Sequence, residues 1–181
     1  MAKVAFFTFG ILREARGHPQ VQGFFDRNAR TFEAAERSDG FLGRSTRDPD
    51  TGQHGWGEQV APRFFREDEH GGAPRTLSLW EDLESVFAFA YSGVHAEALS
   101  RRKEWFLSPA WSTYVAWWVP DDHTPDWHEA TVRHERLHDH GPSPYAFDFQ
   151  HPFGPDDSPV DMDRVRVKVT MARNAHVSRT E

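Results

Sequence analysis

A glycine and a histidine lie together in a stretch that otherwise has the periodicity of one helix, AYSGVHAEAL at residues 90–99. Glycine in a helix interior costs about 1 kcal/mol relative to alanine, so helices normally avoid it. Histidine changes its protonation state near neutral pH, which suits it to act as a general base. Gly93 is therefore either a tolerated defect or a break in the helix that lets the His95 side chain point in a different direction.

A second pattern of chemical interest is HERLH at residues 134–138, which has the form H-E-x-x-H. On a helix, His134 and His138 lie on one face and could bind one zinc ion, with Glu135 beside them as base. A protease site also needs a third ligand and an open cleft, and the HGPSP sequence ends the helix directly afterwards. We interpret the pattern as a helix face that carries histidines, and we expect no metal to be required.

Composition narrows the class of protein. The chain has 181 residues, a net charge of −7 and no cysteine, which argues against a basic nucleic-acid-binding face and excludes disulfides and thiolate metal sites. No apolar run is long enough to cross a membrane, and the N-terminus lacks the features of a signal peptide, so we expect a cytoplasmic protein without membrane partners. Aromatic residues make up 14% of the chain, which fits either an aromatic core or a cavity for a flat organic ligand.

The pattern of apolar residues predicts alternating strands and helices. Runs of Val, Leu and aromatic residues predict strands, and apolar residues with a 3.6-residue period predict helices. The predicted helix at 83–106 is divided at Gly93. Thr124 and Pro125 are read as the N-cap and first residue of the third helix. The expected strands are 4–12, 41–48, 75–82, 112–120 and 145–153, and the expected helices are 20–37, 83–106 and 121–144.

Two further segments are less regular. Residues 58–67 are read as a return strand or an irregular connection, since Pro62 is unsuited to a central strand. In RVRVKVTM at 164–171, apolar and polar residues alternate strictly, which predicts a half-buried strand. The order β-α-β-β-α-β is that of a ferredoxin-like split unit.

Four stretches also carry a resemblance: FTFGILREARGHPQVQGF, LSLWEDLESVFAFAYSGVHAEALSRRKEWF, YVAWWVP and LHDHGPSPYAFDFQHPF. Together they resemble an uncharacterised bacterial domain-of-unknown-function family within the dimeric α/β barrels, the superfamily of antibiotic-biosynthesis monooxygenases. The resemblance implies an α+β fold, a ferredoxin-like unit forming a dimeric α/β barrel, with an extra C-terminal helix and strands. We therefore assign the barrel domain to residues 1–153 and a C-terminal linker and strand extension to 154–181.

The resemblance also implies an activity. It suggests a cofactor-independent oxygenase that uses O₂ on an electron-rich, polyketide-like aromatic small molecule in secondary metabolism, without metal or organic cofactor. It places the LSLWE segment and the helix of His95 at a pocket between sheet and helices, with His95 as base. Because a fold does not fix a function, two alternatives stay open. One is a haem-binding barrel enzyme with His95 as axial ligand, and the other is a non-catalytic small-molecule-binding protein.

Further residues are assigned to this pocket. Trp80 and Tyr91 would stack on the substrate or hydrogen-bond to it, and Asn28 and Arg44 would stabilise its anion. Strand position alone suggests Phe7, Phe9 and Trp117 as pocket walls.

We expect a homodimer for a separate reason. The strands VAFFTF and YVAWWV are apolar on both faces, and the subunit's own helices are expected to cover only one of them. The other face would be an exposed apolar patch too large for a monomer.

Overall fold

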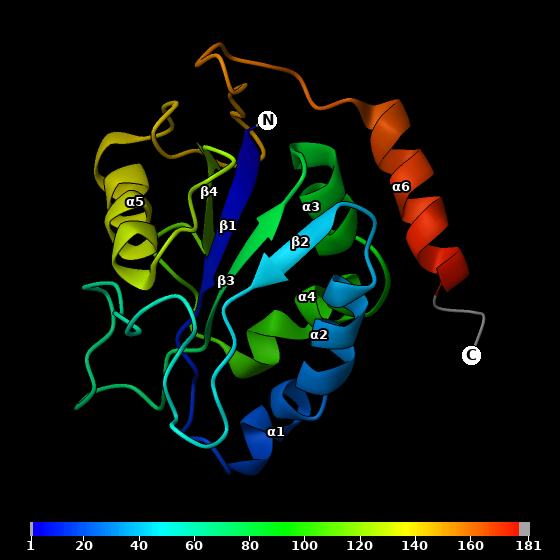
Figure 1. Cartoon of the computed structure of the whole chain (residues 1–181). Helices are drawn as coiled ribbons and strands as arrows, with labels where there is room; N and C mark the ends of the chain where they lie inside the picture. Colours follow the sequence, from blue (N-terminus) through cyan, green and yellow to red (C-terminus); the bar gives the residue numbers. More distant parts are fainter. Residues whose placement is uncertain (1, 178–181) are drawn as a thin grey trace.

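The computed structural model describes residues 2–177 and contains a four-stranded antiparallel sheet with helices on both faces (Figure 1). The strands are β1 (Lys3–Phe9), β2 (Phe41–Arg44), β3 (Arg75–Trp80) and β4 (Tyr114–Val119). Their order in the sheet is β2-β3-β1-β4. The central strand β1 pairs with β3 on one side and with β4 on the other. Connected through the intervening helices, this is the ferredoxin-like topology, so the predicted α+β fold class is confirmed.

The helices connecting the strands come in pairs. The first crossover holds α1 (Pro19–Phe25) and α2 (Asn28–Glu36), and the second holds α3 (Leu83–Ala90) and α4 (Gly93–Trp105). The helix expected at 20–37 is therefore two helices, with a turn at residues 26–27 between them. The division predicted at Gly93 is confirmed, since α4 begins at that glycine.

One face of the sheet packs on the crossover helices. Its core is built around Val4 and Phe6 of β1 and Trp80 of β3, which meet Leu83 and Val86 of α3. A last helix, α6 (Arg164–Val177), lies against α3 on its outer side (Figure 1). Val167 of α6 is 4% exposed and belongs to the same core.

The opposite face is also buried within the same chain. The apolar side chains of Phe7, Phe9 and Trp117 lie beneath α5 (Trp127–His140) and the long segment 45–74. Phe7 and Trp117 are 0% exposed. The exposed apolar face from which we expected a homodimer is therefore absent, because α5 and segment 45–74 cover it. The homodimer itself stays a prediction, without that support.

Three further expected elements differ in the structure. Residues 164–171 are helical rather than extended, and 145–153 forms no regular strand, with Phe147 joined to Ala116 of β4 by an isolated bridge. Helix α5 begins later than expected, because Asp126 rather than Thr124 is the N-cap and its side chain accepts a hydrogen bond from the Glu129 N–H. Segment 58–67 takes the irregular alternative.

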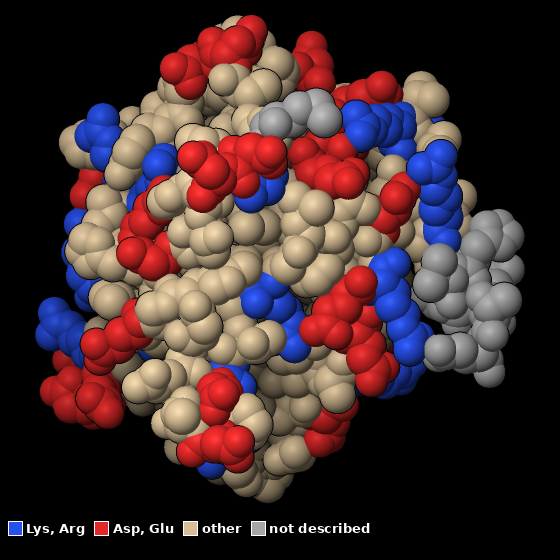
Figure 2. Space-filling model, in the orientation of Figure 1, with Lys and Arg blue, Asp and Glu red and all other residues tan. Residues whose placement is uncertain are grey.

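The charge distribution of the surface and the character of the helices bear on what nucleic acids and membranes require of a partner. The face seen in Figure 2 carries acidic and basic side chains side by side, with no continuous basic surface on that side. No helix within residues 2–177 has both the length and the apolar character needed to cross a membrane.

Candidate functional site

His95 lies just after the break between α3 and α4. Gly93 adopts a φ of +55°, a left-handed conformation that glycine takes without the strain other residues incur. The chain turns there, and the His95 ring comes back onto the end of α3, where Nδ1 lies 2.8 Å from the Ala90 carbonyl oxygen. The break thus gives His95 a fixed partner on the preceding helix.

This hydrogen bond determines the chemistry of the ring. A carbonyl oxygen only accepts, so Nδ1 must carry the proton and Nε2 keeps its lone pair. Nε2 has no hydrogen-bond partner among residues 2–177. Burial lowers the pKa of His95, and the bond to Ala90 opposes this only in part. His95 is therefore a neutral imidazole with one free acceptor nitrogen, which is the form a general base needs.

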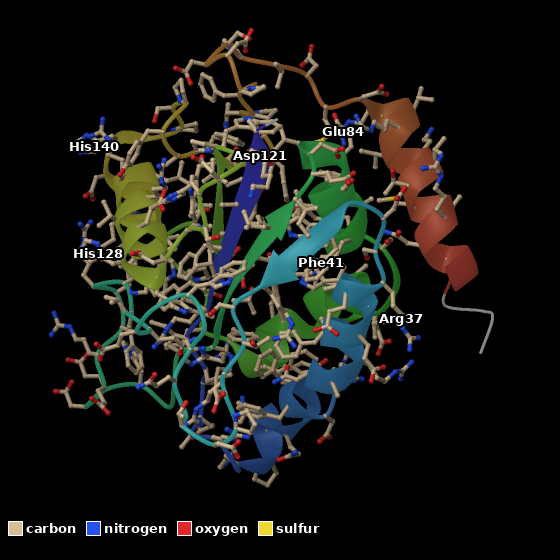
Figure 3. The ribbon with its side chains drawn as sticks, in the orientation of Figure 1. Arg37, Phe41, Glu84, Asp121, His128 and His140 are labelled. Atoms are coloured by element: carbon tan, nitrogen blue, oxygen red, sulfur yellow. The ribbon has the colours of Figure 1, made fainter. Side chains whose placement is uncertain are left out.

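An aromatic stack connects His95 to Trp80. The ring of Phe89 lies 4.8 Å from that of His95 and 5.2 Å from that of Trp80, measured between centroids. Trp80 also contacts Phe41, which Figure 3 labels on the edge strand β2. The Trp80 Nε1 donates to Ser78 Oγ at 2.9 Å. Trp80 is only 1% exposed. It therefore packs against Phe89 as part of the core and is not accessible to a ligand in this conformation.

Tyr91, at the end of α3, is the most accessible of the predicted residues. It is 45% exposed and packs on Phe87 and Phe149. Its hydroxyl lies beside that of Tyr114, which accepts a hydrogen bond from the Phe149 N–H at 3.1 Å. Burial, above all, raises the pKa of Tyr114, so this phenol stays protonated at neutral pH.

Tyr114 and Phe149 were missed from the sequence. Tyr114 could have been found, because alternation along β4 puts it on the same face as Ala116, toward the helices of His95. Phe149 could not, since it lies in a segment read as a strand and reaches Tyr114 through an irregular loop.

The remaining predicted residues do not join this group. Asn28 begins α2 and is half-buried. Arg44 Nε lies 2.8 Å from Glu36 Oε1, so its charge is already paired. The Arg44 Cζ also lies 4.2 Å from the centroid of the Phe32 ring. The predicted walls Phe7, Phe9 and Trp117 are on the far face, separated from His95 by the sheet itself. One pocket formed by all eight residues is therefore not what the structure shows.

The HERLH residues lie on α5 but do not converge. His134 is 0% exposed and its Nε2 donates to the Ser112 carbonyl oxygen at 2.5 Å. Glu135 accepts a hydrogen bond from the Arg63 N–H at 2.7 Å, and the His138 ring packs on Phe64. Other histidines of α5, such as His128 and His140, lie on its outer side (Figure 3). Within residues 2–177, no three His, Asp or Glu side chains form a group that could hold a metal ion.

Comparison with known proteins gives a family and several distant structural likenesses. The model of the family described as Domain of unknown function (DUF3291) matches residues 3–163. A protein of unknown function from Nitrosomonas europaea, NE2512, shares 14% identity, with 69% of this chain and 96% of that one covered and a TM-score of 0.43. SnoaB, a cofactor-independent oxygenase from Streptomyces nogalater, shares 13% identity, with 68% and 97% covered and a TM-score of 0.39. No protein with a curated description matches the chain in sequence.

Proposed function

The chain belongs to the family described as Domain of unknown function (DUF3291), and we propose that it is an enzyme that oxygenates an electron-rich aromatic small molecule without a cofactor. The observation that carries the proposal is the state of His95. Its Nδ1 proton is held by the Ala90 carbonyl, and its Nε2 is left as a free acceptor in a half-buried side chain. The aromatic residues around it, Phe89 and Tyr91 first, are of the kind that stack on a flat substrate.

The reaction needs little from the protein. With an anthrone as substrate, His95 Nε2 takes a proton from the CH₂ carbon, and the carbanion adds to O₂ so that a C–O bond forms. The His95 imidazolium returns its proton to the peroxide. The O–O bond then breaks as the second C–H proton leaves, giving a quinone carbonyl and one water. One anthrone and one O₂ thus give one anthraquinone and one H₂O. The Tyr91 hydroxyl would donate a hydrogen bond to the substrate oxygen on which negative charge develops.

The test is oxygen uptake by the full chain with anthrone and 1,8-dihydroxyanthrone, corrected for uptake in buffer alone. His95→Gln should lower the rate by about 10²–10⁴-fold, the range typical of a general base. His128→Gln, on the exposed side of α5, is the matched control and should keep the wild-type rate. Far-UV circular dichroism checks that both variants fold.

Three results would overturn the proposal. The first is uptake no faster than in buffer for both anthrones, and the second is a His95→Gln variant as fast as wild type. The third is an absorption spectrum of the purified protein with a Soret band that shifts in His95→Gln, which would assign His95 to haem instead. Tight binding of an anthrone without turnover would favour a binding protein.

A further inference from the structure

On the face of the sheet opposite His95, several polar atoms are enclosed without a partner. They are His54 Nδ1, Arg75 Nε, Trp111 Nε1 and His134 Nδ1, and none has a hydrogen-bond partner among residues 2–177. A buried polar group without a partner costs about 1–3 kcal/mol, and native proteins retain few of them. Four within one layer of the fold therefore call for an explanation.

Three of the four side chains surround Phe9. The Trp111 ring is 6.0 Å from that of Phe9 and the His134 ring is 5.5 Å away, both between centroids. Arg75 is the cross-strand partner of Phe9 and so extends from the same face of the sheet. Phe64 of segment 45–74 covers the group, with its ring stacked at 5.0 Å on Trp111 and 5.7 Å from His134.

His54 completes the group from the neighbouring position. Its ring lies 5.5 Å from that of Trp127, which in turn contacts Phe7. Burial lowers the pKa of His54, and the positive charges of Arg47 and Arg75 lower it further.

The pattern of donors and acceptors is specific. Arg75 Nε–H and Trp111 Nε1–H can only donate. The Arg75 guanidinium is half-buried and makes no ion pair with a carboxylate among the described residues, its Nη1 donating instead to the Ala73 carbonyl oxygen. His134 is the reverse case. Because its Nε2 proton is given to the Ser112 carbonyl, Nδ1 can only accept.

We propose that this face of the sheet, beneath segment 45–74, is a binding site for an aromatic hydroxy acid. The carboxylate would accept from Arg75 Nε and Trp111 Nε1, which supplies the missing negative charge. The hydroxyl would donate to His134 Nδ1. The ring between them would lie among the side chains of Phe9, Phe64 and Trp111, in place of part of their mutual contact.

Segment 45–74 must move for such a ligand to enter. Apart from an isolated bridge between Arg47 and His54, it has no regular strand or helix. So long an irregular segment is uncommon in a compact domain and is usually either a functional loop or a linker. Its middle is attached to α5 by polar contacts of Arg63 with Asp139 and Glu135 and by the Thr131 hydroxyl on the Val60 carbonyl. These are contacts that can break and re-form without disturbing the sheet.

The test is calorimetric titration of the full chain with 3- and 4-hydroxybenzoate. At least one isomer should bind with a Kd of about 1 mM or tighter. Benzoate, which lacks the hydroxyl, and the two hydroxybenzamides, which lack the charge, should each bind at least about 10-fold more weakly, the effect of roughly 1.4 kcal/mol. Arg75→Met should weaken the hydroxybenzoate by 10-fold or more, and Trp111→Phe, which keeps the ring and removes the N–H, by several-fold.

Two controls separate binding from folding and from the activity proposed above. Arg66→Met changes an exposed arginine of the same segment and should bind like wild type. His95→Gln should also bind like wild type, because His95 is on the other face. In the absence of ligand, Arg75→Met should unfold at the same urea concentration as wild type or a higher one, since an unpaired, half-buried charge is removed. A merely structural arginine would give the opposite result.

The proposal is overturned if neither hydroxybenzoate binds, if the hydroxybenzamides bind as tightly as the acids, or if Arg75→Met and Trp111→Phe bind as wild type does. A loss of binding in Arg75→Met accompanied by lower stability is resolved by Trp111→Phe, which must then weaken binding at unchanged stability.

Discussion

Replacement of the buried histidine of α5 should change how the stability of the protein depends on pH. His134 is 0% exposed, and its ring lies against Phe7, Phe9 and Phe64. Burial lowers its pKa, and of the nearby groups the Ser112 carbonyl and Glu135 raise it while His138 lowers it. The folded protein therefore keeps His134 neutral at a pH where the unfolded chain, with an ordinary pKa near 6.5, is already protonated.

The sign and size of the effect follow from this difference. Below about pH 6.5 the unfolded state binds one more proton than the folded state at this position, so the free energy of unfolding falls as the pH falls. The fall is about 1.4 kcal/mol per pH unit for one histidine, and it continues until the pH reaches the lowered folded pKa. Above about pH 6.5 the contribution is fully present.

His134→Leu removes this titration but also the hydrogen bond to the Ser112 carbonyl. At about pH 7.5 the variant should be less stable than wild type by about 1–3 kcal/mol, the cost of leaving that carbonyl unpaired. The gap should then narrow as the pH falls below about 6.5, by at most about 1.4 kcal/mol per pH unit, because wild type loses stability there and the variant does not. Urea unfolding followed by far-UV circular dichroism at several pH values measures both quantities.

A matched variant, His140→Leu on the exposed end of α5, should keep the pH dependence of wild type. If His134→Leu shows the same slope as wild type in this range, then His134 does not stay neutral in the folded state. The reasoning from its burial would then be refuted.

Two further pairs of substitutions test local packing, one at glycines and one on α6. Gly40→Ala should lower the free energy of unfolding by about 2 kcal/mol or more in urea unfolding, because Gly40 has a φ of +79° and a Cβ there would lie 2.3 Å from Ser85 Oγ. Gly93→Ala, with φ +55° and nothing within 4 Å of the added Cβ, should cost only about 1 kcal/mol, and equal costs would contradict the steric argument. Val167→Ala on the buried side of α6 should lower the free energy of unfolding by about 2 kcal/mol and the melting temperature with it. Val165→Ala, at a position that is 74% exposed, should change the free energy of unfolding by less than about 0.5 kcal/mol. A melting temperature unchanged by Val167→Ala would mean that α6 does not pack on α3 in solution.

The central fold could be predicted because its signals are local. Short aromatic and β-branched runs marked the four strands, and Gly93 marked the division between α3 and α4. The order of these elements then determined the ferredoxin-like topology. The placement of His95 and Trp80 at one pocket came from the family resemblance rather than from local pattern.

Segment 164–171 shows where local pattern fails. Its valines alternate with charged residues, as in a strand, but Asp163 caps a helix there by accepting from the N–H groups of Val165 and Arg166. Val167 and Thr170, three positions apart, are then both buried, in contact with the rest of the fold. Packing on α3 outweighs the alternation, at the cost of leaving Val165 exposed.

The group of partnerless polar atoms beneath segment 45–74 could not be predicted from the sequence. That both faces of the central strands are apolar was visible in the sequence, but not which segment covers them. The partnerless atoms of Arg75 and Trp111 become apparent only when segment 45–74 and α5 are in place, because their burial depends on residues far away in the chain.

The burial of both sheet faces also limits how copies of the molecule can meet. Two sheets cannot pack face to face unless α5 and segment 45–74 are displaced, so only the edges of the sheet remain for backbone pairing. At one edge, β4 already exchanges hydrogen bonds between Ala116 and Phe147. At the other, β2 has four residues and an irregular register between Phe41 and Gly43. Short, irregular edges are poor templates for an added strand, so neither edge of the sheet offers a second molecule a long row of free backbone groups.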